Sequence, residues 1–257
     1  NILLIIIITI SSLILTSCNG NKELVAGFDV IEKKDNTLVE EKPQYGGELV
    51  LPLTTIKSLN PLLSENVKYY YFSKLIFESM FEFDNDLNIV NVLAKDYSIK
   101  DEGKIIDITL RDDVYWHDGE KFTSEDVKFT IDTIKYGAID STYKNLILSG
   151  VKPFSSSDIR HILDVKTTGD YSLEVVFDRS YSNGLEILTF PIIPKHVFST
   201  GKNEKENYAN ALAEDVKIIG TGPYKLDEYE KLKAVKLKAN ENWWNGKPYI
   251  EYITGKR

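Results

Sequence analysis

Apolar and polar residues alternate at several places along the chain, and each alternation predicts a β-strand with one buried face. Ile106, Ile108 and Leu110 alternate with polar neighbours, which is the two-residue period of a strand. The same period predicts strands over residues 171–177 and 235–239, and residues 46–51 are expected to form the first strand. Sheets are therefore expected from near the start of the folded region to its end.

A helical period follows the strand over residues 105–110. Three apolar residues recur at the spacing of one helix face: Val127, Ile131 and Ile134. Thr123 or Ser124 is suited to cap the first free N–H groups, and Glu125 and Asp126 place negative charge at the positive end of the helix dipole. We predict a helix over residues 124–136, with Gly137 as its C-terminal stop.

A second helix is predicted from Ser64 to about Met80. It contains the aromatic run of residues 69–72. Successive residues point in different directions around a helix, so at most two of these rings face any one surface. Core packing is therefore favoured over ligand stacking as the role of the run.

The N-terminal apolar run, Ile2 to Leu15, is shorter than the roughly 20 residues that a membrane-spanning helix needs. It fits a secretory leader, which we assign to residues 1–17. The run closes on Leu15-Thr16-Ser17-Cys18, which resembles a bacterial lipobox and implies lipidation of Cys18. The alternative is a cleaved leader with an incidental cysteine. Residues 18–44 are polar and are expected to form a flexible tether.

Charge and composition argue against several classes of function. The net charge of −8 and the lack of a concentrated basic surface argue against a nucleic-acid partner. His117, His161 and His196 stand apart in the sequence, and no metal-binding motif or nucleophile elbow is present. We therefore predict no enzyme activity, no cofactor and no metal site, and we expect His117 to order its turn by a structural hydrogen bond.

Four motifs in order along the chain resemble the family 5 extracellular solute-binding proteins, the receptors of oligopeptide, dipeptide and nickel ABC importers. The first is the opening, Gly46-Gly47-Glu48-Leu49 with Leu59-Asn60-Pro61. The second is Leu110-Arg111 with Trp116-His117-Asp118-Gly119 and Thr123-Ser124-Glu125-Asp126-Val127. The third and fourth are Ile219-Gly220-Thr221-Gly222-Pro223-Tyr224 and Asn240-Glu241-Asn242-Trp243-Trp244-Asn245-Gly246-Lys247-Pro248. The resemblance extends from Gly46 to about Ile253.

This resemblance implies an α/β fold of the periplasmic-binding-protein type II-like class, with mixed sheets and flanking helices. It places lobe I in residues 45–79 and 179–257 and lobe II in residues 80–178. Members have roughly twice this length, so a further lobe is expected beyond residue 257, and the sequence is expected to be a fragment at both ends.

The function implied is that of a monomeric receptor, exported and lipid-anchored in the cell envelope, on the periplasmic side or the outer surface of the cytoplasmic membrane. It would capture a small solute, most simply a short peptide, by closing a cleft, and hand it to an ABC permease. Alternatives are an adhesin or sensor of the same fold, or a receptor for nickel, haem or sugar. Five residues are predicted ligand contacts: Ile56, Ser58, Leu59, Asn60 and Tyr224.

Overall fold

The structure is a computed structural model, and it describes residues 42–54, 56–63, 67–139 and 158–257. The predicted leader, the lipidation site at Cys18 and nearly all of the predicted tether lie outside these residues. Pro43–Arg257 form one compact unit. Among the described residues, no helix combines the length and apolar character that a membrane crossing requires.

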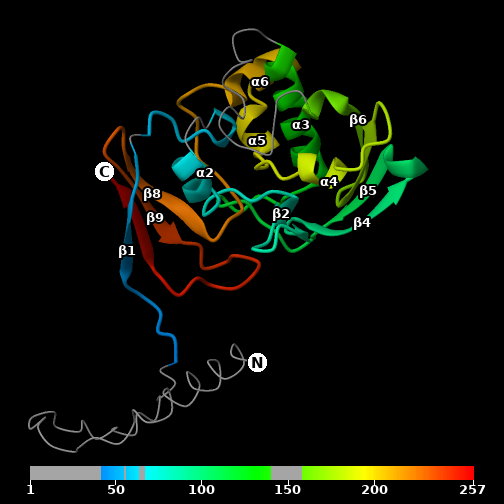
Figure 1. Cartoon of the computed structure of the whole chain (residues 1–257). Coiled ribbons are helices and arrows are strands. Elements are labelled where there is room, and N and C mark those ends of the chain that lie inside the picture. Colours follow the sequence, from blue (N-terminus) through cyan, green and yellow to red (C-terminus); the bar gives the residue numbers. More distant parts are fainter. Residues whose placement is uncertain (1–41, 55, 64–66, 140–157) are drawn as a thin grey trace, which may run out of the picture. The chain divides into compact units, whose positions relative to one another are not determined.

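One four-stranded sheet joins the two ends of this unit, in the order β1-β10-β9-β8 (Figure 1). It contains β1 (Glu48–Pro52), β8 (Tyr224–Glu230), β9 (Ala234–Ala239) and β10 (Tyr252–Lys256). β1 runs parallel to β10, whereas the other pairs are antiparallel. The predicted strand over residues 235–239 is confirmed, and the predicted first strand begins two residues later than expected, at Glu48.

The second four-stranded sheet is antiparallel and has the order β4-β5-β7-β6. Its strands are β4 (Ala94–Lys100), β5 (Ile105–Leu110), β6 (Ile162–Gly169) and β7 (Ser172–Phe177). The strands predicted over residues 105–110 and 171–177 are therefore confirmed. A separate hairpin, β2 (Phe81–Phe83) with β3 (Ile89–Asn91), precedes this sheet in the chain.

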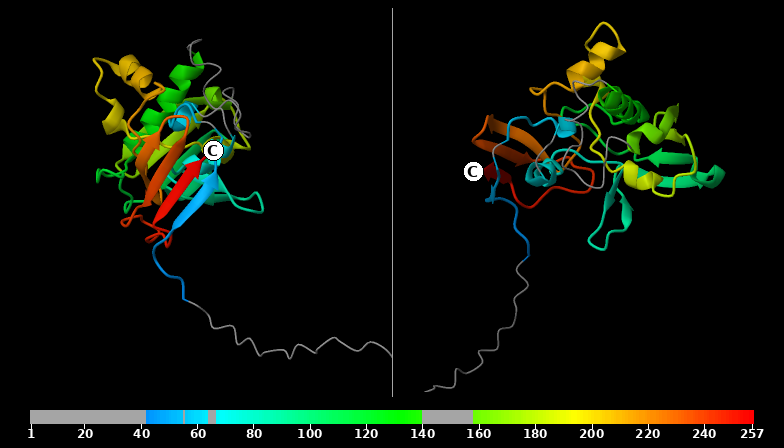
Figure 2. Two further views of the ribbon diagram at one scale, coloured as in Figure 1. Left: turned by 90° about the vertical axis from the view of Figure 1, so that its left-hand side faces the viewer. Right: turned by 45° about the horizontal axis from the view of Figure 1, so that its top comes forward.

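The main helix, α3 (Ser124–Ile139), confirms the helical period but runs past its predicted stop at Gly137. Gly137 is buried within the helix and does not have the positive φ of a C-terminal glycine stop. The short helices α4 (Gly184–Ile187), α5 (Lys195–Phe198) and α6 (Glu204–Ala211) follow the second sheet. Helix α3 contacts β6, α5 and α6, and Figure 2 shows these helices from two further directions.

The helix predicted from Ser64 to Met80 is much shorter, because α2 spans only Val67–Ser73. The helix ends at Ser73, whose carbonyl accepts from the N–H groups of Ile76 and Phe77, at 2.9 and 2.8 Å. The chain then runs extended toward β2, and Ser79 forms an isolated β-bridge with Pro191. The remaining short helices are the 3-10 turns η1 (Pro61–Leu63), η2 (Asp101–Gly103) and η3 (Asp158–His161).

Two hydrophobic cores stabilise the unit. The larger core contains the apolar faces of α3 and of the β4-β5-β7-β6 sheet, together with residues of the segment from Ile187 to Leu212. The smaller core contains the buried faces of α2 and of β8, β9 and β10. Tyr69 and Phe72 are buried in the smaller core, whereas Tyr71 is 65% exposed, so the aromatic run serves mainly core packing as predicted.

Candidate functional site

The predicted ligand loop is fastened to the segment that follows α6. Asn60 is 1% exposed. Its side-chain amide donates to the carbonyls of Ala211 and Ala213, at 2.8 and 2.9 Å, and its side-chain oxygen accepts from the N–H of Leu62 at 3.0 Å. Both the amide N–H₂ and the side-chain oxygen of Asn60 are therefore engaged by the protein's own backbone, and these contacts fix the shape of the loop.

The other loop residues are also held by internal contacts. The Ser58 hydroxyl accepts from the N–H of Asn60 at 3.0 Å and donates to the carbonyl of Glu214. Leu59 and Ile56 are buried, and their carbonyls accept hydrogen bonds from two tyrosine hydroxyls, those of Tyr69 and Tyr229 respectively.

Tyr224 lies at the start of β8 with its ring in the smaller core. Its hydroxyl donates to the carbonyl of Ile250 at 3.0 Å, and burial raises the pKa of the phenol. The four loop residues lie together, whereas the Tyr224 hydroxyl contacts a different segment, at Ile250. Solute contact by these five residues stays a prediction.

His117 joins two of the sequence motifs. Its Nδ1 accepts from the N–H of Gly220 at 3.2 Å, and its Nε2 lies 3.0 Å from the carbonyl of Gly222. This pattern requires the neutral ring with its proton on Nε2. Burial lowers the pKa of His117 to about 4, which keeps the ring neutral near pH 7. The predicted structural role is confirmed, although the partners lie in the glycine motif rather than in the histidine's own turn.

The glycines of that motif are required by close packing. Neither Gly220 nor Gly222 has a positive φ. A Cβ added to Gly220 would lie 1.9 Å from the carbonyl oxygen of Ile76, and one added to Gly222 would lie 2.7 Å from it. The N–H of Gly222 donates to the same oxygen at 2.9 Å. The motif therefore lies directly against the main chain that follows α2.

Two positions after Ile76, the side chain of Glu78 is only 5% exposed and is surrounded by hydrogen-bond donors. The indole Nε1 of Trp243 lies 3.1 Å from one carboxylate oxygen, and Nε1 of Trp244 lies 3.1 Å from both oxygens. The Thr221 hydroxyl is a further donor. Burial is the largest effect on this group and raises the pKa of Glu78 to about 7, while these donors oppose the rise.

Trp243 and Trp244 lie next to each other, and Trp244 packs against the larger core. Both are half-buried, with ring centroids 5.6 Å apart. The guanidinium of Arg111 lies 3.9 Å from the centre of the Trp244 ring, which is a cation–π contact. Asp113 holds Arg111 in place through two hydrogen bonds of 2.9 and 2.7 Å.

Glu78 and the two indoles border a cavity of about 290 Å³, which we call the Trp–Glu hollow. It lies between the base of the β2–β3 hairpin and the segment after β9, two regions that are near each other in Figure 1. The residues that line it are Lys74, Glu78, Glu82, Asn91, Val92, Pro223, Trp243, Trp244 and Asn245. The hollow thus combines carboxylates, amides and aromatic rings.

One lysine and two carboxylates are the charged groups of this lining. Lys74 Nζ lies 3.5 Å from a carboxylate oxygen of Glu82, and both side chains are partly exposed. Glu78 adds a second carboxylate, so the lining carries excess negative charge whenever Glu78 is ionised. Across the described residues, no group of three or more His, Cys, Asp or Glu side chains is arranged to hold a metal ion.

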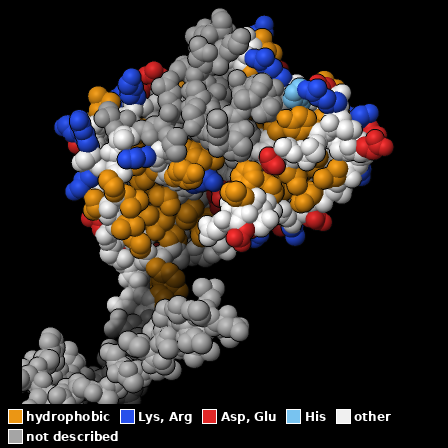
Figure 3. All heavy atoms as spheres, in the orientation of Figure 1, with side chains coloured by type: hydrophobic (Ala, Val, Ile, Leu, Met, Phe, Trp, Pro, Cys, Tyr) orange, Lys and Arg blue, Asp and Glu red, His pale blue; other side chains and the backbone are white. Residues whose placement is uncertain are grey.

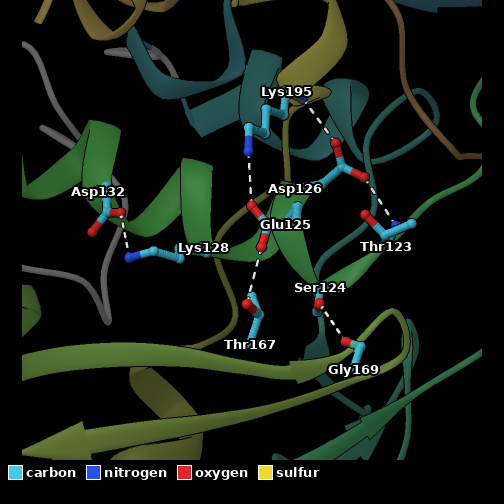
Figure 4. Close-up of polar contacts among 9 residues, drawn as sticks. All are labelled: Thr123, Ser124, Glu125, Asp126, Lys128, Asp132, Thr167, Gly169 and Lys195. Atoms are coloured by element: carbon cyan, nitrogen blue, oxygen red, sulfur yellow. Dashed lines mark hydrogen bonds and ion pairs between the residues drawn. The ribbon is translucent and has the colours of Figure 1, made fainter. Parts of the chain in front are cut away.

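A second buried carboxylate, Asp126, organises the start of α3 (Figure 4). It accepts from the N–H groups of Thr123 and Lys195, at 2.9 and 2.8 Å, and from Nε1 of Trp116 at 3.2 Å. The Ser124 hydroxyl, one of the two predicted caps, donates instead to the carbonyl of Gly169 at 2.7 Å. Asp126 therefore accepts one N–H at the start of α3, that of Thr123, and links this end of the helix to the start of α5 through Lys195.

Sequence reasoning missed Glu78 and the hollow. A carboxylate within the mostly apolar stretch of residues 75–81 was the available signal, because an isolated acid in such a run is rarely buried without partners. The partners themselves were not visible, since Trp243 and Trp244 lie 165 and 166 positions away.

Comparison with known proteins agrees with this architecture. Residues 88–256 match the family model described as bacterial extracellular solute-binding proteins, family 5 Middle. The oligopeptide-binding protein AppA of Bacillus subtilis is 26% identical over 262 residues, covering 99% of this chain and 44% of AppA. The glutathione-binding protein GsiB of Salmonella typhi is 25% identical and aligns over 35% of its length. The chain therefore spans less than half the length of these relatives.

Solved structures give the same result. The structure of AppA in complex with a nonapeptide superposes with a TM-score of 0.69 at 26% identity, over 84% of this chain and 40% of that one. NikZ of Campylobacter jejuni, solved with Ni(L-His), gives a TM-score of 0.62 at 27% identity over 84% of this chain and 39% of that one. The expected periplasmic-binding-protein fold is confirmed, and the chain belongs to the family 5 bacterial extracellular solute-binding proteins.

Proposed function

We propose that the protein is the solute-binding component of an ABC importer and that its solute is a short peptide. The observation that carries this proposal is the match to AppA, which extends over 99% of the chain and superposes on a structure that holds a nonapeptide. Peptide capture by this class needs no covalent step. Binding would shift an open–closed equilibrium, and the closed form would deliver the solute to the permease.

The lobe assignment is part of the proposal: residues 45–79 and 179–257 form lobe I, and residues 80–178 form lobe II. The shared sheet of β1, β8, β9 and β10 supports grouping the two ends of the described chain. Residues from Ile187 to Leu212, however, pack in the larger core, and packing alone groups them with residues 80–178.

Peptide binding is tested by calorimetry and thermal shift on the purified protein. Peptides of three to nine residues are expected to raise the melting temperature, because a ligand that binds only the folded state stabilises it. Free amino acids serve as the size control. Absence of any shift with a diverse peptide pool at millimolar concentration would overturn the peptide assignment.

A second solute class has one specific observation in its favour, the similarity to NikZ solved with Ni(L-His). The same assay with Ni²⁺ plus L-histidine separates the two classes. A response to nickel–histidine together with no response to peptides would replace the peptide proposal by a metal-chelate receptor.

Anchoring is the remaining part of the proposal. Removal of residues 1–17 and lipidation of Cys18 would hold the receptor at the outer face of the cytoplasmic membrane, as the lipobox-like sequence suggests. Cys18→Ala is expected to move the protein from the membrane fraction to the soluble fraction. Ser17→Ala, which keeps a small residue before the cysteine, is the matched control, and unchanged fractionation of Cys18→Ala would contradict lipid anchoring.

A further inference from the structure

The Trp–Glu hollow has a composition suited to one kind of ligand. Its volume of about 290 Å³ is near the lower end of the roughly 300–1,000 Å³ typical of small-molecule sites. Its described lining includes none of the five predicted solute contacts. The hollow therefore raises a question separate from peptide capture: what chemistry its carboxylates and indoles would accept.

Anions are disfavoured, because Glu78 and Glu82 both contribute to the lining and Lys74 is already paired with Glu82. A purely apolar ligand would displace water from the partly exposed carboxylate of Glu82 without replacing its hydrogen bonds. A cation, in contrast, would gain from the carboxylates and from the electron-rich faces of the indole rings.

The protein itself shows that one of these rings accepts a cation. Arg111 lies over Trp244 with its guanidinium carbon 3.9 Å from the ring centre. Both indole N–H groups are directed at Glu78, so the carboxylate and the two rings are held in a fixed mutual geometry before any ligand arrives. Preorganisation of this kind reduces the entropy lost on binding.

We propose that the Trp–Glu hollow is a binding site for a small organic cation carrying an ammonium or guanidinium group. Glu78 is the buried counter-charge, Glu82 is the outer carboxylate, and the indoles of Trp243 and Trp244 provide the aromatic walls. This site goes beyond the proposed capture of a peptide, and its occupancy does not require that function.

Proton release accompanies binding in this arrangement. Burial raises the pKa of Glu78 to about 7, and a bound cation favours the carboxylate form. Affinity therefore rises with pH up to about 7 and then levels off. The other charged or titratable groups around Glu78 are Glu82 on β2, Lys74 after α2, Arg111 over the ring of Trp244, and His117, which contacts Gly222. The pKa of about 4 leaves His117 neutral throughout this range.

The test uses agmatine, which carries one ammonium and one guanidinium group, in calorimetric titrations of the purified protein at constant ionic strength. Saturable binding is expected, and a carboxyl pKa of about 7 predicts affinity roughly twentyfold higher at pH 7.5 than at pH 5.5. n-Butanol and butyrate are the neutral and anionic control ligands, for which no saturable heat is expected.

Variants separate the hollow from other surfaces. Glu78→Gln is expected to weaken agmatine binding at least tenfold at pH 7.5 and to abolish its pH dependence. Glu82→Gln, at a partly exposed position that leaves the buried contacts intact, is expected to weaken binding severalfold while the protein stays folded. Asp86→Asn removes an exposed carboxylate from the tip of the same hairpin and is expected to change nothing.

The outcomes decide between the two proposals. Agmatine binding that is absent at millimolar concentration, or equally affected by Asp86→Asn and Glu82→Gln, would overturn the cation site. Peptide binding together with no agmatine binding would leave the receptor proposal standing and remove only this one. Agmatine binding that persists at saturating peptide, with the expected pH dependence, would support a site separate from the peptide.

Discussion

Asp126 and Glu78 are two buried carboxylates that differ in the kind of hydrogen-bond donor around them. Each accepts a tryptophan N–H, and burial raises the pKa of each. Asp126 lies in the first turn of α3, where the helix dipole favours negative charge, and it also accepts from two backbone N–H groups, those of Thr123 just before α3 and of Lys195 at the start of α5. Glu78 has side-chain donors and borders an open hollow, and its pKa reaches about 7.

This difference in donors gives the two buried acids different roles. Backbone donors are fixed by the fold, so the charge on Asp126 is tied to the structure of α3 and of the segment at Lys195. Donors on side chains beside a cavity leave Glu78 able to gain or lose a proton with little change in the backbone. The first arrangement suits a structural joint, and the second suits a group that responds to a ligand.

The largest expected effect tests whether the backbone around Glu78 is as tightly constrained as that around Asp126. Gly220→Ala places a methyl group 1.9 Å from the Ile76 carbonyl, and we expect it to lower the free energy of unfolding by at least about 5 kcal/mol. Circular dichroism during urea unfolding measures this. Gly246→Ala is the control: its φ is +95° with open space around it, and about 1–2 kcal/mol is expected. Equal losses would show that the contact with Ile76 relaxes easily.

The second-largest loss of stability is expected from removing the Asp126 carboxylate. Asp126→Ala leaves two backbone N–H groups and the Trp116 indole without an acceptor in the larger core, and we expect a loss of about 4 kcal/mol. The neighbouring Glu125→Ala is the matched control, because Glu125 forms a surface ion pair with Lys195 and less than about 1 kcal/mol is expected. Similar unfolding curves for the two variants would remove the distinction drawn above.

Glu78→Ala should destabilise the protein less, by about 3 kcal/mol, since water in the hollow can reach the freed indole N–H groups. Glu78→Gln should lose only about 1 kcal/mol at pH 7, where half of the carboxyl groups already carry a proton. The emission wavelength of Trp243 and Trp244 reports the local change alongside urea unfolding. A larger loss for Glu78→Gln than for Glu78→Ala would contradict the assigned protonation.

The smallest effect concerns pH. The folded-state pKa of Glu78 lies above its ordinary value of 4.5, so its stabilising contribution is full below pH 4.5 and is lost as pH rises to about 7. His117 acts in the opposite sense: its folded pKa lies below 6.5, and stability is lost as pH falls from 6.5 toward 4. Each contribution taken alone amounts to about 3 kcal/mol, and the two largely cancel in the wild type.

Thermal unfolding of the wild type, Glu78→Gln and His117→Gln at half-unit pH steps measures both contributions. Because the two windows overlap, each variant should reveal the contribution of the other group: Glu78→Gln should lose stability as pH falls from 6.5 toward 4, and His117→Gln should lose stability as pH rises from 4.5 to about 7. Parallel profiles for all three proteins would show that neither group titrates differently in the folded state.

The place of Asp126 in the first turn of a helix was predictable from the sequence, whereas its contacts with Trp116 and Lys195 and the burial of Glu78 were not. A helix cap depends on neighbours within one turn, so the charge at residue 126 could be assigned from the local pattern alone. The period-two strands over residues 105–110 and 171–177 were predictable for the same reason. The surroundings of Glu78 depend on segments brought together by the fold, and no local pattern contains them.

The end of α2 is a second place where a local sequence pattern was not enough to predict the structure. Residues 74–80 contain enough apolar side chains to continue a helix, and the sequence predicted that they would. The chain instead leaves the helix at Ser73, since the carbonyl of Ile76 is needed by the N–H of Gly222 and Ser79 bridges to Pro191. Tertiary pairing thus overrode local propensity.

The parallel pairing of β1 with β10 has a consequence for the order of folding. Glu48 lies opposite Tyr252, so the first strand meets a partner from the other end of the described chain. Contacts so distant in sequence close late, because the loop between them must be ordered first. During synthesis β1 has no place in its sheet until β10 has emerged, and the residues of the smaller core stay uncovered for most of that time. Under the export proposed above, such late closure would keep the chain unfolded for longer before it crosses the membrane.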